Sequence, residues 1–291
     1  MDFLLNAGTG WSATNPFYYT LKNYCHVGHQ REMGYLKLIH KKSNISNYKQ
    51  ILRERSVEDI EELLKPPYTI DKYIDYYLKL DKGTCHAVGD FTNYNFELPE
   101  EFLIEWRDKM SQHFNVRVTF QFRDPIRRYF SEVGKFIQHQ HILSGLDSHK
   151  IKHNAYVKSK QHIKLFRHYL SSCPIFPPAY YTQNIQKFVR VFGQDKVLPI
   201  IMEQFWNPER KKEQCERLSR FLDYEITDIH ENVYYPDRGS KAPHTEGLKD
   251  QYGSDFEDMT PELYEWSKQY LGFVYSDWEK CYETLPEEWN R

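Results

Sequence analysis

Four short apolar runs along the chain have the length of buried β-strands. They are DFLLNA at 2–7, CHAVGDF at 85–91, VRVTFQF at 116–122 and KVLPIIM at 196–202. Apolar residues dominate these runs, as expected for strands that are covered on both faces. The pattern therefore predicts four strands buried inside a sheet.

The stretches between these runs carry helix signals. SVEDIEELL opens with the capping-box pair Ser56 and Asp59. The segments 98–114 and 180–193 have apolar residues at helical spacing, and Gly193 ends the second one. Strands separated by helices predict an α/β fold with three layers (α/β/α), in which helices flank a central parallel β-sheet.

The domain organisation follows from the absence of internal repeats and low-complexity linkers. We expect residues 1–291 to form a single domain. The connection at 138–178 is long and rich in His and Lys. It is interpreted as an insertion that faces a substrate, with plain surface as the alternative.

The composition limits the classes of function. With 39 Lys+Arg against 41 Asp+Glu the formal charge is −2, which argues against a protein that coats nucleic acid. The five cysteines are widely spaced and form no CxxC pair, so neither a zinc site nor a disulfide framework is predicted. No signal-peptide pattern and no apolar run of about 18 residues is present. We therefore expect a cytoplasmic chain without a membrane span.

A glycine-rich turn follows the first apolar run, where ligands of parallel sheets collect. Two glycines allow backbone N–H groups to face an anion, and hydroxyl groups and the N-terminal end of the next helix add further donors. The alternative is a plain strand-to-helix turn, because the lysine of the GxxxxGK[ST] pattern is missing. The turn residues assigned to phosphate binding, here called the phosphate loop, are Gly8, Thr9, Gly10, Trp11, Ser12, Ala13 and Thr14.

A second candidate anion site follows the third apolar run, in FRDPIRRYFSEV. Asp124 is suited to an N-cap and Pro125 to the first helical position. Arg123 lies where strand gives way to helix, and with Ser131 it forms the candidate site. For Arg128 we favour an ion pair with an acidic residue of the scaffold.

Two anion sites at the ends of strands indicate one ligand with phosphates at both its ends. Here the sequence resembles the sulfotransferases that use 3′-phosphoadenosine 5′-phosphosulfate (PAPS), particularly the Golgi heparan-sulfate type and its microbial relatives. GTGWSATN is similar to their loop for the 5′-phosphosulfate, and RDPIRRYFS to their RxPxxRxxS motif. The resemblance implies a P-loop-type α/β/α fold, with the 3′-phosphate held by Arg123 and Ser131.

Three further segments agree with this family in order. REMGYL resembles a KE-x-x-F-F segment and implies that Glu32 is the general base, with His29 as the alternative. GDFTNY resembles an EKTPxY stretch, although Asn93 replaces its proline. RGSKAP resembles a KGRxxP loop that closes over the 3′-phosphate and precedes an aromatic C-terminal helix. Its residues assigned to the donor are Arg238, Gly239, Ser240 and Lys241.

Trp11 departs from the family pattern, because it occupies the position of a catalytic Lys or Arg. The charge of the leaving group then has to be met by backbone N–H groups, Ser12 and Thr14, and a lysine from elsewhere. Lys241 and Lys22 are the candidates, and loss of the cation makes low activity an open alternative. A second interpretation is that Trp11 stacks on a sugar or on the adenine.

The predicted function is transfer of a sulfonyl group from PAPS to a hydroxyl group without a metal. A carbohydrate is the favoured acceptor, and a small alcohol or a protein tyrosine is the alternative. One alternative is a non-catalytic protein that binds a glycan or 3′-phosphoadenosine 5′-phosphate (PAP). Another is a nucleotide phosphotransferase, disfavoured by the missing lysine and the lack of a Mg²⁺ carboxylate pattern. Lys and His residues suited to an anionic polysaccharide, or to a solvated face, are Lys135, His139, His141, Lys152 and Lys158.

Overall fold

The structure of this protein is a computed structural model. The described residues are 1–9, 14–27, 33–41, 63, 65–80, 85–130, 132–133, 166–168, 170–171, 180–205, 207–229 and 261–289. They fall into two compact units, Met1–Phe122 with Gln183–Asn232 and Arg123–Thr182 with Val233–Arg291. A single domain for residues 1–291 stays a prediction.

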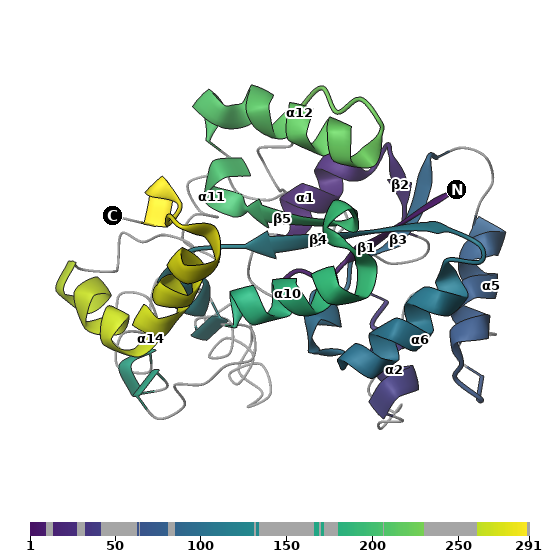
Figure 1. Ribbon diagram of the computed structural model, residues 1–291, viewed down its shortest axis with the longest axis horizontal. Coiled ribbons are helices and arrows are strands. Elements are labelled where there is room, and N and C mark those ends of the chain that lie inside the picture. Colours follow the sequence, from purple (N-terminus) through teal and green to yellow (C-terminus); the bar gives the residue numbers. More distant parts are fainter. Residues whose placement is uncertain are drawn as a thin grey trace, which may run out of the picture. The chain divides into compact units, whose positions relative to one another are not determined.

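The first unit contains a five-stranded sheet in which every pair of neighbours is parallel. The strand order is β2-β3-β1-β4-β5, as Figure 1 shows. Leu4 pairs with Gly89 of β3 on one side and with Arg117 of β4 on the other. The strands are β1 Asp2–Asn6, β2 Cys25–His26, β3 Ala87–Asp90, β4 Asn115–Phe122 and β5 Val197–Ile201.

Helices lie on both faces of this sheet (Figure 1). The helices of the described residues are α1 Thr14–Leu21, α2 Tyr35–Lys41, α5 Ile70–Leu80, α6 Glu100–Met110, α10 Tyr181–Phe192, α11 Met202–Phe205, α12 Lys211–Leu222 and α14 Pro261–Tyr282. Short 3₁₀ helices are η1 Asn95–Glu97, η3 Gln194–Lys196, η4 Pro208–Arg210 and η7 Glu287–Trp289.

An aliphatic and aromatic core covers one face of the sheet. Leu4, Leu198 and other strand residues pack with buried side chains of α1, α11 and α12. The rings of Phe17 on α1 and Phe205 on α11 lie 5.8 Å apart. These helices therefore form one outer layer, above the sheet in Figure 1.

The opposite face is packed mainly with aromatic rings. Phe3 of β1 contacts the rings of Tyr77 on α5, at 4.9 Å, and Trp106 on α6, at 5.7 Å. Farther along, Phe120 of β4 meets Phe188 of α10 edge-on at 4.9 Å. Much of the high aromatic content thus serves to pack the second helical layer, as tilted and edge-on pairs commonly do.

Most of the predicted architecture is confirmed. The four apolar runs are β1, β3, β4 and β5, and the three-layer α/β/α arrangement around a parallel sheet is present. The segment 98–114 contains α6, and the segment 180–193 contains α10, which ends before Gly193 at φ 94°. Strand β2 was not predicted, because two residues are too short to form a visible apolar run. The Ser56 capping box and nearly all of 138–178 lie outside the described residues.

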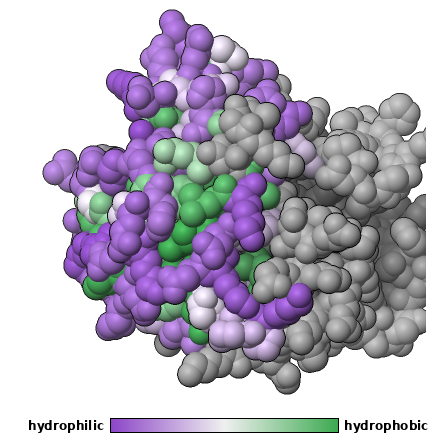
Figure 2. All heavy atoms as spheres, turned by 90° about the vertical axis from the view of Figure 1, so that its right-hand side faces the viewer, coloured by the Kyte–Doolittle hydropathy of each residue, from purple (hydrophilic) through white to green (hydrophobic). Residues whose placement is uncertain are grey.

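The surface around α5 is mainly hydrophilic. Figure 2 shows hydrophilic residues over most of the described atoms on this side, with a small group of hydrophobic ones among them. Leu78 of α5 is 40% exposed, whereas Tyr73 and Tyr77 on the same helix are buried. Within the described ranges, no helix combines the length and the apolar character that crossing a bilayer would need.

The second unit begins with the N-cap that the sequence predicted. Asp124 Oδ1 accepts a 2.9 Å hydrogen bond from the backbone N–H of Arg127, and helical residues 125–130 follow. In the same unit, α14 packs with η7 through a ring contact of 4.9 Å between Trp278 and Trp289. The predicted aromatic C-terminal helix is thereby confirmed as α14.

Candidate functional site

The carboxyl edge of the sheet carries a group of buried polar side chains. Three of them follow or end the strands, namely Asn6 at the end of β1, Asp90 at the end of β3 and Gln121 near the end of β4. Asn95 of η1 joins them, because its side-chain Nδ2 donates to the backbone oxygen of Asn6 at 3.2 Å. Parallel sheets bind ligands at this edge, so it is the candidate functional site.

The first residues of the phosphate loop are fixed to β4 and to the end of β1. The Ala7 N–H donates to the Thr119 backbone oxygen at 2.9 Å, and the Thr9 N–H to that of Gln121 at 3.3 Å. The Thr9 hydroxyl also donates to the Gln121 oxygen, at 3.1 Å. Between them, the Gly8 N–H donates to Asn6 Oδ1 at 3.0 Å. The amides of residues 7–9 thus bond to acceptors inside the protein.

Gly8 has a packing role at this edge in addition to its predicted place in the phosphate loop. A Cβ atom at this position would collide with Gln121 Oε1 and would lie 3.0 Å from Asn6 Oδ1. The glycine makes room for the buried amides of Asn6 and Gln121, and its own N–H is already bonded to one of them. We infer that any phosphate held by amides of the loop uses those that follow Thr9.

If the loop binds the nucleotide that the sequence resemblance implies, Gly8→Ala is expected to weaken that binding as well as stability. The methyl group forces the Gln121 side chain out of its buried position, and such overpacking commonly costs about 1–3 kcal/mol. Because the same residues hold the entry to the loop, we expect PAP affinity to fall together with the melting temperature. Calorimetric titration and thermal unfolding of the variant check this. Wild-type PAP affinity in a folded Gly8→Ala protein would contradict the assignment of residues 8–14 to phosphate binding.

Three buried polar atoms at this edge have no hydrogen-bond partner among the described residues. They are Asn6 Nδ2, Gln121 Oε1 and Asn95 Oδ1. Buried polar atoms are nearly always bonded, so these three mark a polar interior beneath the carboxyl edge.

Asp90 is the centre of a second buried network at this edge. Its Oδ2 accepts a bond of 2.9 Å from the Tyr73 hydroxyl, and its Oδ1 accepts bonds from the N–H and the hydroxyl of Thr92, at 2.9 and 2.5 Å. Burial, and next the nearby Asp90 carboxylate, raise the pKa of Tyr73, which keeps its hydroxyl a donor. Thr92 Oγ1 in turn accepts a bond of 2.7 Å from the Gly34 N–H. The network anchors the chain two residues after Glu32.

Two lysines near η1 already have partners. Lys187 Nζ donates to the backbone oxygens of Phe96 and Leu98, at 2.5 and 2.9 Å, and burial lowers its pKa to about 8. Lys37 forms an ion pair of 2.7 Å with Glu97. Neither side chain is therefore a good candidate for the cation that the sequence resemblance predicts to be missing at Trp11.

Lys22 is ruled out as that cation by its place on the chain. It is exposed and lies one residue beyond the C-terminal end of α1, not on the helix as expected. The phosphate loop precedes the N-terminal end of α1, about 12 Å away along eight helical residues. Tyr24, two residues further, bonds to Asp2 at the start of β1. Lys22 thus lies near the opposite edge of the sheet.

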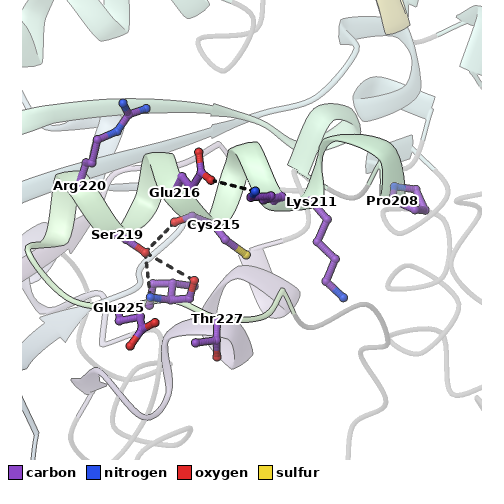
Figure 3. A pocket seen from close by; sticks show the side chains of 10 residues that line it. Pro208, Lys211, Cys215, Glu216, Ser219, Arg220, Glu225 and Thr227 are labelled. Carbon is purple, nitrogen blue, oxygen red and sulfur yellow. Dashed lines mark hydrogen bonds and ion pairs between the residues drawn. The ribbon is translucent and has the colours of Figure 1, made fainter.

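A pocket of about 810 Å³ lies elsewhere in the first unit, along α12 (Figure 3). Its charged side chains are partly paired, since Lys211 and Lys212 contact Asp228 and Glu216. The Ser219 hydroxyl donates to the Cys215 backbone oxygen and accepts from the Ile226 N–H. Several polar groups of this pocket thus bond to one another. Among the described residues, no group of His, Cys, Asp or Glu is arranged to hold a metal ion.

Solved sulfotransferases share this architecture. A sulfotransferase from Alicyclobacillus acidocaldarius aligns with 100% of this chain and 99% of its own, with a TM-score of 0.53 and 14% sequence identity. The sulfotransferase domain of the Synechococcus PCC 7002 olefin synthase aligns over 94% of each chain, with a TM-score of 0.50 and 13% identity. The chain has a sulfotransferase fold. No protein-family model matches the sequence, and a search of curated proteins gave no match.

In this sulfotransferase fold only part of the predicted site can be located. Gly8 and Thr9 lie at the carboxyl edge, Thr14 begins α1, and Arg123 directly follows β4. The predicted residues outside the described ranges are Gly10, Trp11, Ser12, Ala13, His29, Glu32, Ser131, Arg238, Gly239, Ser240 and Lys241. Their roles stay predictions.

For two residues of the second unit the structure gives partners. Arg128 is buried, and its Nη1 lies 3.0 Å from Glu132 Oε2, so the expected scaffold ion pair is confirmed. The backbone oxygen of Arg123 accepts a bond of 2.8 Å from the Tyr181 hydroxyl. This fixes the main chain of Arg123, the residue assigned to the 3′-phosphate.

Sequence reasoning missed the buried amides that shape the edge. Asn6 and Gln121 carry signals that would have identified them, since each is a polar residue within or at the end of an apolar strand, in DFLLN and in VTFQF. Buried polar side chains are uncommon and usually have a structural or functional cause. Their contact with Gly8, however, depends on β1 and β4 being neighbours, which the sequence did not show.

Proposed function

We propose that this protein is a sulfotransferase that moves a sulfonyl group from PAPS to a hydroxyl group of an acceptor. The observation that carries the proposal is that the glycine-rich loop follows β1 at the carboxyl edge of a sheet with a sulfotransferase fold. The sequence resemblance supplies the choice of donor.

The two ends of the donor are assigned to different segments. The phosphate loop, Gly8 to Thr14, is proposed to bind the 5′-phosphosulfate, with the amides after Thr9 and the hydroxyls of Ser12 and Thr14 as donors. Arg123 and Ser131 are proposed to bind the 3′-phosphate, and Arg238 to Lys241 to close over it. Arginine suits this part because its guanidinium binds phosphate through two parallel hydrogen bonds.

Glu32 is proposed to act as the general base. Its carboxylate takes the proton of the acceptor hydroxyl while the oxygen forms a bond to sulfur, and the bond between sulfur and the 5′-phosphate oxygen breaks. The electron pair of that bond stays on the phosphate, which leaves as PAP. His29 is the alternative base. The Gly34–Thr92–Asp90 network supports Glu32 indirectly, because it fixes the main chain two residues later.

The leaving group requires a positive charge that Trp11 does not provide. We propose Lys241 for this part, since Lys22 lies at the far end of α1 and Lys187 already bonds to two backbone oxygens. Trp11 is then available to stack on the adenine or on a sugar. A carbohydrate acceptor is proposed from the resemblance to the heparan-sulfate type.

Trp11 also favours a second candidate function, a protein that binds PAP or a glycan without turnover. Loss of one preorganised charged donor commonly costs about 10²–10³ in rate. A non-catalytic protein that binds PAP shares the nucleotide with the enzyme and differs from it only in transfer. Activity therefore separates them, whereas binding does not.

Nucleotide binding and sulfonyl transfer test the proposal in turn. We expect PAP to raise the melting temperature without metal, because a ligand that binds only the folded state stabilises it. We also expect transfer of radiolabelled sulfonate from PAPS to at least one member of a panel of glycans. Stabilisation by ATP with Mg²⁺ but not by PAP would favour a phosphotransferase and reject both candidates. PAP binding without any transfer would favour the non-catalytic one.

A further inference from the structure

Asp124 lies at the centre of a buried cluster in the second unit. It is 1% exposed and immediately follows Arg123. Its Oδ1 accepts a bond of 2.9 Å from the Arg127 N–H, as an N-cap does. Its Oδ2 accepts bonds from the hydroxyls of Tyr264, at 3.2 Å, and Tyr275, at 3.0 Å. An N-cap needs only the first of these bonds, and the two tyrosines satisfy the second oxygen of this buried carboxylate.

The two tyrosines come from one helix and converge on one oxygen. They lie eleven residues apart on α14, about three helical turns, which places them on the same face. Both are buried, at 6% and 8% exposure. Burial, followed by the charge of Asp124, raises the pKa of each hydroxyl, so both remain donors at neutral pH. Asp124, Tyr264 and Tyr275 are called the Asp124 cluster below.

The main chain of Arg123 is held on its other side as well. Its backbone oxygen accepts the 2.8 Å bond from Tyr181, which is 1% exposed. The ring of Tyr181 contacts Trp278 of α14 and Trp289 of η7 at 6.5 and 6.0 Å. Arg123 is thus fixed through its carbonyl group and through the next residue, and both attachments lead to α14 and η7.

We propose that the Asp124 cluster is a positioning element that aims Arg123 and thereby sets selectivity for nucleotides with a 3′-phosphate. This inference rests on the proposed function, since it assumes that Arg123 binds that phosphate. Two parallel hydrogen bonds between a guanidinium and a phosphate depend on direction, so a small displacement of the Arg123 main chain weakens them. Binding of the rest of the nucleotide does not depend on Arg123.

The test compares two ligands that differ only in the 3′-phosphate, PAP and adenosine 5′-monophosphate. In the double variant Tyr264→Phe/Tyr275→Phe we expect PAP affinity to fall about tenfold, as displaced binding groups commonly cost this much or more. We expect the affinity for the monophosphate to stay unchanged. Calorimetric titration measures both. A general loss of structure would weaken the two ligands together, so the ratio of affinities separates positioning from stability.

Two further variants complete the design. Tyr282→Phe is the matched control, because it removes a hydroxyl from the same helix at a residue that packs against Trp278. It is expected to leave both affinities unchanged. Tyr264→Phe alone removes the longer of the two bonds and leaves the carboxylate of Asp124 with Tyr275. It serves as the milder test if the double variant does not fold, and a smaller loss of PAP affinity alone is expected.

Three outcomes are distinguishable. A wild-type protein that binds neither ligand, or both equally, would reject the proposed role of Arg123 and with it this inference. A wild-type preference for PAP that persists in the double variant, or in folded Tyr264→Phe, would overturn the inference and leave the proposed function standing. A preference for PAP that decreases in the double variant or in Tyr264→Phe, but not in Tyr282→Phe, supports the inference.

Discussion

Glu32→Gln is expected to lower kcat for sulfonyl transfer by about 10²–10⁴, the usual contribution of a positioned general base. The amide keeps the size of the side chain but cannot take the proton of the acceptor hydroxyl. Affinity for PAP should remain unchanged, because the proposed donor contacts come from other segments. Single-turnover transfer from PAPS, combined with calorimetric titration of PAP, measures the two quantities separately.

His29→Gln is the matched comparison for this variant. If Glu32 is the base, His29→Gln should retain most of the transfer rate. A large loss in His29→Gln together with a wild-type rate in Glu32→Gln would exchange the two roles. Equal and small effects of both substitutions would show that neither residue is the base.

Gly89→Ala is expected to destabilise the fold by about 3 kcal/mol or more, at the upper end for overpacked cores. Gly89 pairs with Leu4 in the middle of the sheet. A Cβ atom there would lie 2.5 Å from the backbone oxygen of Leu4 and 2.8 Å from Cys25 Sγ. Relief of the first contact requires movement of the β1 main chain, which is bonded on both sides. Because the free energy of unfolding of native proteins is only about 5–15 kcal/mol, a loss of this size removes a large part of the stability.

Gly272→Ala is the control for this prediction. It lies within α14, and an added Cβ atom has no neighbour within 4 Å. Alanine at a helix interior position is expected to stabilise by about 0.5–1 kcal/mol. Urea unfolding of both variants checks the opposite signs. A Gly89→Ala protein as stable as the wild type would contradict the described register of β1 and β3.

Strands β1, β3, β4 and β5 could be predicted because each is a compact apolar run that needs no knowledge of its neighbours. Their order could not, since nothing in DFLLNA indicates that residues near 87 and 115 lie beside it. Helix α12 was missed because its sequence, KKEQCERLSRFL, contains few apolar residues. Cys215, Leu218 and Leu222 are nevertheless enough to cover the sheet. The burial of a helix depends on the elements that pack against it, and a local sequence pattern does not show these elements.

The positions of Gly8 after β1 and of Arg123 after β4 were predicted, but their contacts were not. The glycine-rich loop and Arg123 were found from residue types and from position after the strands. The use of the Gly8 N–H was not foreseen, because its acceptor is a side chain whose orientation depends on packing. The same holds for Asp124, whose N-cap role is a local signal, while its bonds to Tyr264 and Tyr275 span 140 and 151 residues.

The central place of β1 has a consequence for synthesis on the ribosome. Its neighbours β3 and β4 begin at Ala87 and Asn115, so β1 emerges well before either partner exists. At about 5–20 residues per second the strand waits for several seconds with both edges unpaired. An apolar strand in that state is a target for aggregation and for chaperones. The order of synthesis therefore leaves β1 in need of protection until its partner strands have been made.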